Sequence, residues 1–231
     1  MKQLLVVAAH PDDEVLGCFG AVARLIREGH EAYTLILGRG KEARGSADQD
    51  ELRLFQKEML RANESIGIKE VFTADFPDNA FDSVPLLNIV KKIEEIKEKI
   101  APDIIFTHHV GDINVDHQVT HRAVLTATRP KPEESVKTIY AMEIPSSTEW
   151  NGYAKETAFV PDVFFDISGT IESKMLALAE YKSELMPYPH PRSMEHVKSL
   201  AKTNGAKVGL KYCENFVLIR SIMSCHENTE C

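Results

Sequence analysis

The sequence predicts an α/β fold: a single domain with a mainly parallel sheet and helices on both faces. Strand-like apolar runs alternate with helical patterns from the start of the chain to about residue 145. The first run, Leu4–Ala9, is continuously apolar, as a strand covered on both faces requires. Repeated strand–helix units of this kind imply right-handed crossovers and an open sheet.

The elements follow one another in a regular order. We predict strands at 4–9, 32–37, 71–74, 104–107 and 138–144, and helices at 17–29, 49–66, 84–100 and 116–128. The helix at 84–100 is amphipathic, because Ile89, Ile93 and Ile96 recur at helical spacing with Lys and Glu between them. Two prolines, Pro130 and Pro132, separate the helix at 116–128 from the next strand.

The final third is expected to complete the same domain. Here the pattern predicts strands at 160–167 and 214–219 and helices at about 169–185 and 192–204. We therefore expect one domain over 1–222 and a polar tail over 223–231.

The composition excludes some functions. The chain has 27 Lys and Arg against 35 Asp and Glu, a net charge of -8, and no basic run, which argues against a nucleic-acid partner. A phosphorylated small ligand stays open, because a site can be locally basic. No apolar stretch approaches the ~20 residues that span a bilayer.

Cysteine usage and the N-terminal segment predict a cytoplasmic protein. The opening apolar run is short and is followed by His-Pro-Asp-Asp-Glu, not by the small residues of a signal-peptide cleavage site. Cys18, Cys213, Cys225 and Cys231 show no disulfide-framework spacing, so reduced thiols are expected. A second metal site from Cys225, His226 and Cys231 matches no template, and we expect none.

The segment directly after the first strand carries the strongest chemical signal. In Ala9-His10-Pro11-Asp12-Asp13-Glu14, ionisable groups crowd the strand end that faces the ligand crevice of such sheets. A divalent cation would offset their repulsion, and His with Asp suits zinc. Pro11 would hold the turn that aims His10 and Asp13 inward. The alternative is a polar turn in which Asp12 or Asp13 caps the helix.

A second polar cluster follows the strand at 104–107. His117 could complete a His/Asp/His site, and catalytic zinc commonly has three protein ligands and one open position. Asp116 could hold the metal-binding imidazole or a neighbouring histidine in orientation. Three further histidines, His108, His109 and His121, are better explained as structural residues without a metal role.

Together the two motifs resemble the LmbE-like (PIG-L) N-deacetylase family, whose most specific mark is the AHPDDE signature present at 9–14. The likeness continues through 58–67, 102–108, 112–117 and 214–216. The resemblance implies a Rossmann-like fold, with His10, Asp13 and His117 as ligands of zinc or another divalent cation. It also implies Asp12 as general base and a trimer or hexamer.

The implied reaction removes an acetyl group from an amino sugar or a related N-acetylated small molecule, such as a sugar nucleotide or a surface-polysaccharide precursor. Zinc lowers the pKa of its water to about 7, and Asp12 would take the proton. Many members have a histidine three residues before the last ligand, where this chain has Asn114. Either the Asn114 amide stabilises the oxyanion, or His108 or His109 does so.

Residues that contact the substrate are less well defined. Asp78 could hold sugar hydroxyls or form an Asx turn. Arg192 could pair with a phosphate or lie in the first turn of a helix. We include His109 and His190 as further candidates.

Three other functions would suit a fold of this class. A nucleotide-binding oxidoreductase would need a G-x-G-x-x-G turn that the chain lacks. A non-catalytic binding protein would be expected to have lost Asp12 or a ligand, and none is lost. A zinc amidohydrolase that acts on other amides stays open.

Overall fold

The computed structural model describes residues 1–40, 49–152 and 154–223. Within these residues, strands join in one sheet in the order β3-β2-β1-β4-β5-β7-β6. The strands are β1 (Gln3–Ala8), β2 (Glu31–Gly38), β3 (Glu70–Phe76), β4 (Ile104–His108), β5 (Thr138–Met142), β6 (Val163–Asp166) and β7 (Cys213–Ser221). Neighbours from β3 to β5 pair in parallel, and only β7 runs antiparallel to its neighbours β5 and β6. The prediction of a mainly parallel sheet is confirmed.

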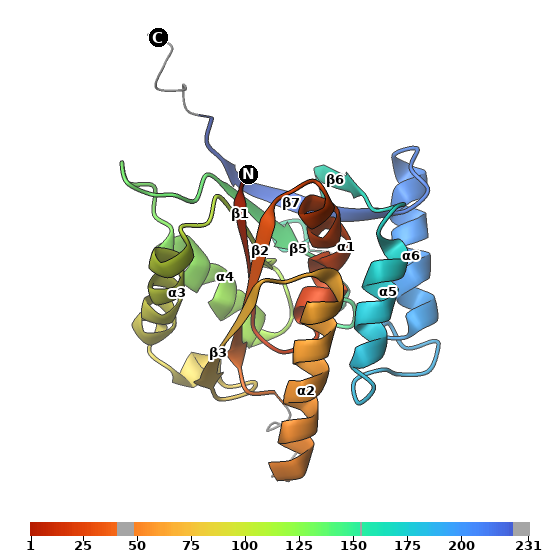
Figure 1. Cartoon of the computed structure of the whole chain (residues 1–231), viewed down its shortest axis with the longest axis horizontal. Helices are drawn as coiled ribbons and strands as arrows, with labels where there is room; N and C mark the ends of the chain where they lie inside the picture. Colours follow the sequence, from red (N-terminus) through yellow and green to blue (C-terminus); the bar gives the residue numbers. More distant parts are fainter. Residues whose placement is uncertain (41–48, 153, 224–231) are drawn as a thin grey trace.

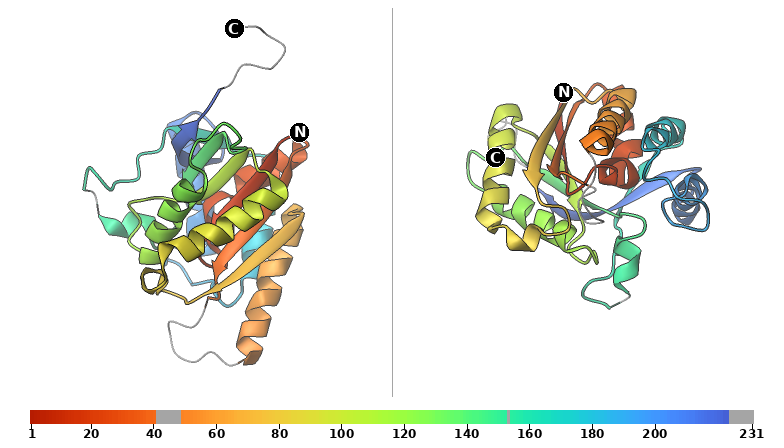
Figure 2. Two further views of the ribbon diagram at one scale, coloured as in Figure 1. Left: turned by 90° about the vertical axis from the view of Figure 1, so that its left-hand side faces the viewer. Right: turned by 90° about the horizontal axis from the view of Figure 1, so that it is seen from below.

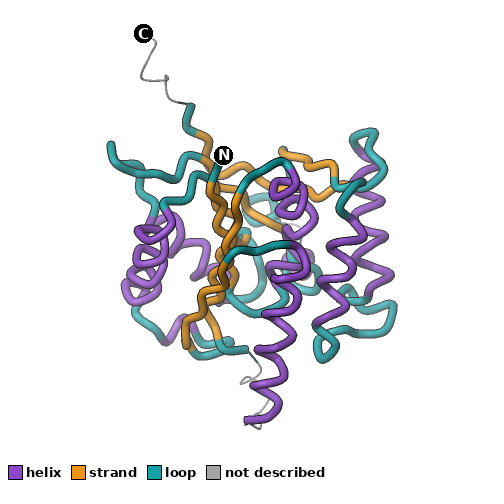
Figure 3. Tube along the Cα trace, viewed as in Figure 1, coloured by secondary structure: helices purple, strands orange, loops and turns teal. Residues whose placement is uncertain are grey.

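Helices cover both faces of the sheet (Figures 1 and 2). The helices are α1 (Asp13–Arg27), α2 (Gln49–Ile66), α3 (Leu86–Ile100), α4 (Val115–Ala127), α5 (Ile171–Glu180) and α6 (Met194–Lys207), with 3₁₀ turns η1 (Phe81–Ser83) and η2 (Thr148–Asn151). On one face lie α3 and α4, and on the other α1, α2, α5 and α6. Figure 3 shows the strands enclosed between these two helical layers.

Strand β1 illustrates how the sequence builds both layers. Its side chains point alternately to the two faces, so Leu4 and Val6 join the core with α1, α2 and α5, whereas Leu5 and Val7 join the core with α3 and α4. All four are fully buried. Each buried aliphatic side chain of this size contributes about 1.5–3 kcal/mol to folding. The uninterrupted apolar run therefore reflects a central strand.

Several predicted boundaries shift in the structure. Helix α1 begins at Asp13 rather than at residue 17, because the chain turns at Asp12 and the acidic first turn suits the positive end of a helix. Helix α5 ends at Glu180 rather than near 185, where the following Tyr181 enters the core. Strand β6 begins at Val163, after Pro161, which cannot donate to a sheet ladder.

Other expectations concern the ends of the chain. None of the helices in the described ranges has the length and apolarity to cross a bilayer. Cys18 and Cys213 are buried free thiols. The predicted tail lies outside the described residues from 224 onward, as do Cys225, His226 and Cys231.

Candidate active site

The two sequence motifs meet at the carboxyl ends of adjacent strands. Strands β1 and β4 pair in parallel, with Val6 opposite Phe106, so the segments that follow them emerge side by side. A hydrogen bond fixes their approach: the Ala9 amide donates to His108 Nε2 at 2.8 Å. The sheet therefore brings together residues about a hundred positions apart, as the parallel-sheet reasoning predicts.

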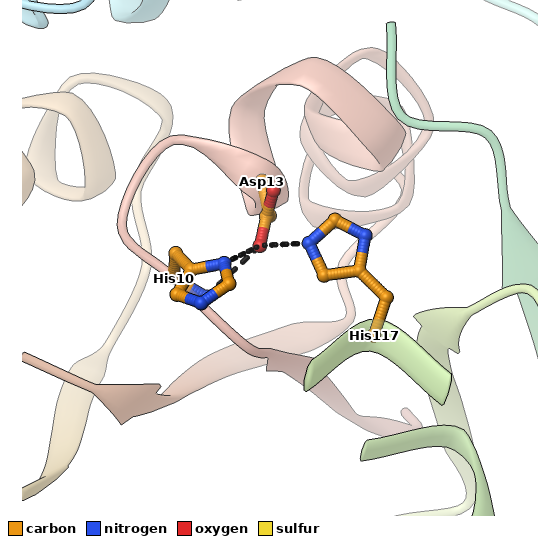
Figure 4. A group of neighbouring side chains, drawn as sticks. All are labelled: His10, Asp13 and His117. Atoms are coloured by element: carbon orange, nitrogen blue, oxygen red, sulfur yellow. Dashed lines mark hydrogen bonds and ion pairs between the residues drawn. The ribbon is translucent and has the colours of Figure 1, made fainter. Parts of the chain in front are cut away.

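A group of three side chains lies at this junction, with Asp13 and His117 buried and His10 partly buried. His10, Asp13 and His117 each offer one ligand atom, and these atoms lie within 4.8 Å of one another. Asp13 Oδ2 is 3.5 Å from His10 Nδ1 and 3.2 Å from His117 Nε2. Figure 4 shows both imidazoles directed at the Asp13 carboxylate, His10 from the turn after β1 and His117 from α4.

This group fits a divalent metal ion. Within the described residues, Asp13 Oδ1 and His117 Nε2 are buried and make no hydrogen bond, and His117 Nε2 has only the ion-pair contact with Asp13 Oδ2 at 3.2 Å. Leaving such atoms unpaired costs about 1–3 kcal/mol each, so their convergence requires an explanation. Two histidines and one carboxylate form a donor set that zinc prefers, and a bound cation would give these atoms a partner.

A second potential metal group shares His10 with Asp78 and Asp116. In that group the carboxylates already have partners: Asp116 Oδ2 lies 2.9 Å from His10 Nε2, and Asp78 Oδ1 lies 3.3 Å from the same nitrogen. The group of His10, Asp13 and His117 explains more, because it accounts for the unpaired atoms.

Carboxylates support both histidines from behind. Asp116 Oδ2 contacts His10 Nε2, while its Oδ1 accepts a hydrogen bond from the Phe81 amide at 2.8 Å. Asp112 Oδ2 lies 3.0 Å from His117 Nδ1. Such partners fix the ring orientation of metal-binding histidines and raise their basicity. The geometry places Asp116 against His10 and not against His117, its neighbour in sequence.

The charges of the group compensate one another. Burial disfavours the imidazolium form of His10, but Asp116 and Asp13 outweigh it and raise the pKa of His10 to about 10. Burial also disfavours the imidazolium form of His117, but Asp13 and Asp112 outweigh it and raise the pKa of His117 to about 9. Burial opposes ionisation of Asp13 as well, yet the positive charge of His117 holds the pKa of Asp13 well below the usual range. A metal ion must therefore displace protons from the two histidines.

Asp12 stands beside this group in an unusual backbone conformation. Its φ is 93°, in the left-handed region that non-glycine residues rarely adopt. Its side chain makes no capping hydrogen bond to α1, so the alternative of a simple helix cap is wrong for Asp12. Burial raises the pKa of Asp12 to about 7, although Arg192 pulls it in the opposite direction. A carboxyl group with a pKa near neutrality suits proton transfer.

Arg192 reaches Asp12 from the C-terminal third of the chain. Its NH1 donates to Asp12 Oδ2 at 3.0 Å, and its Nε donates to Ser146 Oγ at 2.8 Å. NH1 also lies 3.7 Å from Glu184 Oε2. Arg192 precedes the cap of α6, Ser193, so its assignment to the first helical turn is wrong. Its guanidinium is engaged by carboxylates, which weakens the case for a phosphate partner.

Asn114 serves as the N-cap of α4. Its Oδ1 accepts from the Asp116 amide at 2.8 Å, and its Nδ2 donates to Asn79 Oδ1 at 3.1 Å. Its amide group is thus engaged in local structure.

Four further histidines make contacts outside the group of His10, Asp13 and His117. His121 Nδ1 lies 2.9 Å from the His108 carbonyl, and His109 Nδ1 accepts from the Gly111 amide at 3.1 Å, which favours a structural role for both. His108 stacks on His117 with ring centroids 3.9 Å apart, and burial lowers its pKa to about 3, so its ring is neutral. His190 lies two residues before Arg192, and its Nδ1 accepts from the Arg192 amide at 3.1 Å.

Three contributors to the site escaped the sequence reasoning: Asp112, Ser146 and Glu184. Asp112 could have been suspected, because it opens the acidic segment that ends at His117. Ser146 and Glu184 carry no local signal, since they lie far from both motifs in the sequence and contact Arg192 at the site.

A buried His/Asp/His group with an adjacent carboxyl group, at the carboxyl edge of a mainly parallel sheet, is the arrangement that metal-dependent hydrolases use. The chain belongs to the PIG-L family, described as GlcNAc-PI de-N-acetylase, whose sequence model matches residues 5–128, more than half of the chain. This is a family of N-deacetylases, and the resemblance seen in the sequence is confirmed.

Relatives agree with this assignment. A Bacillus cereus protein named "Probable N-acetyl-alpha-D-glucosaminyl L-malate deacetylase 2" is 28% identical over 190 residues, covering 79% of this chain and 84% of that protein. The diacetylchitobiose deacetylase of Thermococcus kodakarensis is 24% identical over 239 residues, covering 96% of this chain and 85% of that protein. The crystal structure of a conserved protein from Thermus thermophilus superposes with a TM-score of 0.77 at 26% identity and covers both chains completely.

Proposed function

We propose that the protein is a zinc-dependent N-deacetylase that releases acetate from an N-acetylated amino sugar or a related small molecule. The main support is the group of His10, Asp13 and His117, whose buried polar atoms lack hydrogen bonds and which lies beside the carboxyl group of Asp12. The family is one of N-deacetylases, and the two relatives described above are named for N-acetylated sugar compounds.

His10, Asp13 and His117 would hold the metal. A bound zinc ion lowers the pKa of a coordinated water to about 7 and polarises a carbonyl oxygen, which is the chemistry that amide hydrolysis requires. Asp116 and Asp112 keep the two imidazoles oriented through their second ring nitrogens.

Asp12 acts as the general base and then as the general acid. It accepts the proton released as water adds to the acetyl carbonyl and passes it to the departing amine nitrogen, so that the products are acetate and a free amine. Arg192 contacts Asp12 through Oδ2 and keeps the carboxyl group in place. The left-handed backbone at Asp12 brings this side chain beside the metal ligands instead of onto the helix terminus.

A bound metal ion would supply the positive charge that stabilises the oxyanion. The sequence offers Asn114 as a candidate donor, but its side-chain amide is engaged with Asn79 and in the cap of α4. Asn114 would have to release Asn79 before it could donate to the substrate.

The test is acetate release from a panel of N-acetylated sugars and sugar nucleotides, by metal-free and zinc-loaded protein. Zinc-dependent acetate release from a panel member supports the proposal. Release of a different acid from a non-acetyl amide would identify another zinc amidohydrolase. No hydrolysis of any amide, with one zinc bound per chain, would refute the catalytic assignment.

A further inference from the structure

An aromatic pair lies at the border of the site, with Trp150 exposed and His190 partly buried. Trp150, in η2, and His190, in the segment before α6, pack edge to face with ring centroids 6.1 Å apart and planes at 79°. Trp150 is 53% exposed, a large fraction for an aromatic residue of this size. No step of the proposed reaction uses either ring.

Both rings are tied to the catalytic residues through short chains of contacts. On one side, the Trp150 amide donates to the Ser147 carbonyl at 3.2 Å, and Ser147 Oγ lies 3.4 Å from His117 Nδ1. On the other side, His190 Nδ1 accepts from the amide of Arg192, whose guanidinium contacts Asp12. The pair therefore connects the loop behind a metal ligand with the loop that holds the general base.

The loop that carries Trp150 is firmly held. Thr148 Oγ1 donates to Asp112 Oδ2 at 2.7 Å, and the Ser146 amide donates to Glu149 Oε1 at 2.6 Å. The Glu149 carboxylate thus accepts a hydrogen bond from the backbone of its own loop and helps to hold that loop in place. A rigid support of this kind suits an aromatic side chain that contacts a ligand, because little conformational freedom is lost on binding.

The surroundings define the chemistry of the ligand. A flat apolar surface beside buried carboxyl groups, with the guanidinium of Arg192 already paired, matches a neutral ring that has an apolar face and a polar edge. A pyranose ring has both. We propose that Trp150 and His190 form a subsite that stacks the sugar ring linked to the one bearing the acetamido group. This inference rests on the proposed function, and it makes the preferred substrate a glycoside of at least two rings.

The chain has one tryptophan, so its indole fluorescence reports on position 150 alone. Zinc-loaded Asp12→Asn protein, in which turnover is blocked, is titrated with N-acetylglucosamine, with N,N'-diacetylchitobiose and with chitobiose. Both disaccharides should shift the indole emission to shorter wavelength, and diacetylchitobiose should bind about tenfold more tightly than the monosaccharide. Unchanged emission with all three sugars would overturn the subsite.

Steady-state kinetics supply the second arm. Trp150→Ala should raise KM for diacetylchitobiose about tenfold with kcat unchanged, leave the monosaccharide unaffected, and be largely rescued by Trp150→Phe. Leu176→Ala, which truncates a similarly exposed apolar side chain on α5, is the matched control and should change neither parameter. Equal effects of Trp150→Ala on both sugars would contradict the proposal.

The two arms separate the two hypotheses. An indole response without acetate release from any sugar would leave the subsite standing and remove the proposed function. Acetate release without an indole response, or with unchanged KM in Trp150→Ala, would leave the deacetylase and remove the subsite.

Discussion

Replacing Asp112 by asparagine should weaken zinc binding about 10–100-fold, although Asp112 would not touch the metal. Its side chain is fully buried, and its Oδ2 lies 3.0 Å from His117 Nδ1 and accepts from Thr148 Oγ1 at 2.7 Å. Burial disfavours its carboxylate, but the hydrogen bond with His117 prevails and lowers the pKa of Asp112 to about 2. Asp112 is therefore ionised at neutral pH.

The magnitude follows from this geometry. Asp112→Asn preserves the shape and the Oδ1 acceptor for the Asn114 amide at 2.8 Å, but it puts an NH₂ group or a neutral oxygen against His117 Nδ1. When His117 binds metal through Nε2, Nδ1 carries the proton and needs an acceptor. Loss of such a partner typically costs 10–100-fold in metal affinity, or about 1.4–2.7 kcal/mol.

The assay is competition for zinc against a chelator of known affinity. Asp103→Asn is the control, because Asp103 is a partly buried carboxylate that accepts from the Gln3 amide at 2.8 Å just before β4, at the end of the strands opposite the site. It should leave zinc affinity unchanged. Wild-type zinc affinity in a folded Asp112→Asn protein would refute the reasoning about His117.

Three further predictions concern charge. His10 and His117, with pKa values of about 10 and 9, carry protons near pH 7 that zinc must displace. Zinc affinity should therefore rise with pH by up to about tenfold per unit for each proton. Equal zinc affinities near pH 6 and pH 8, measured by chelator competition, would contradict this. Lys174→Met should destabilise the fold by about 3–5 kcal/mol in urea unfolding, because Lys174 Nζ contacts buried Glu214 at 2.6 Å; a loss below about 1 kcal/mol would show that Glu214 does not need its counter-charge. Burial raises the pKa of Glu143 from 4.5 to about 7, so its favourable contribution at low pH is lost as pH rises through that value. Glu143→Gln should therefore match the parent near pH 4 and exceed it by about 1–2 kcal/mol near pH 8, and equal stabilities near pH 8 would contradict the sign.

Much of the fold could be predicted because burial leaves a periodic signal. The helix at 49–66 was predicted with the bounds that the structure shows for α2. The start of α1 was not, because the left-handed turn at Asp12 has no signature in a residue type that rarely adopts it. Boundaries near β6 and α5 shifted for similar reasons, since tertiary packing and a proline decided them.

The site shows the same division. The grouping of His10, Asp13 and His117 followed from two motifs at neighbouring strand ends, which parallel pairing brings together. The partners of these residues did not follow, because they depend on how distant segments pack. Asp116 crosses to His10, and Arg192 reaches Asp12 over a sequence separation of 180 residues. No local pattern encodes either contact.

The most direct test of the central claim is the turnover of zinc-loaded Asp12→Asn on a substrate that the parent protein deacetylates. Zinc content is measured on the same samples, so that loss of metal and loss of the base are separated. With one zinc per chain in both proteins, kcat for acetate release should fall by at least about 100-fold in the variant. An unchanged kcat at full zinc occupancy would contradict the assignment of Asp12 as the group that moves the proton.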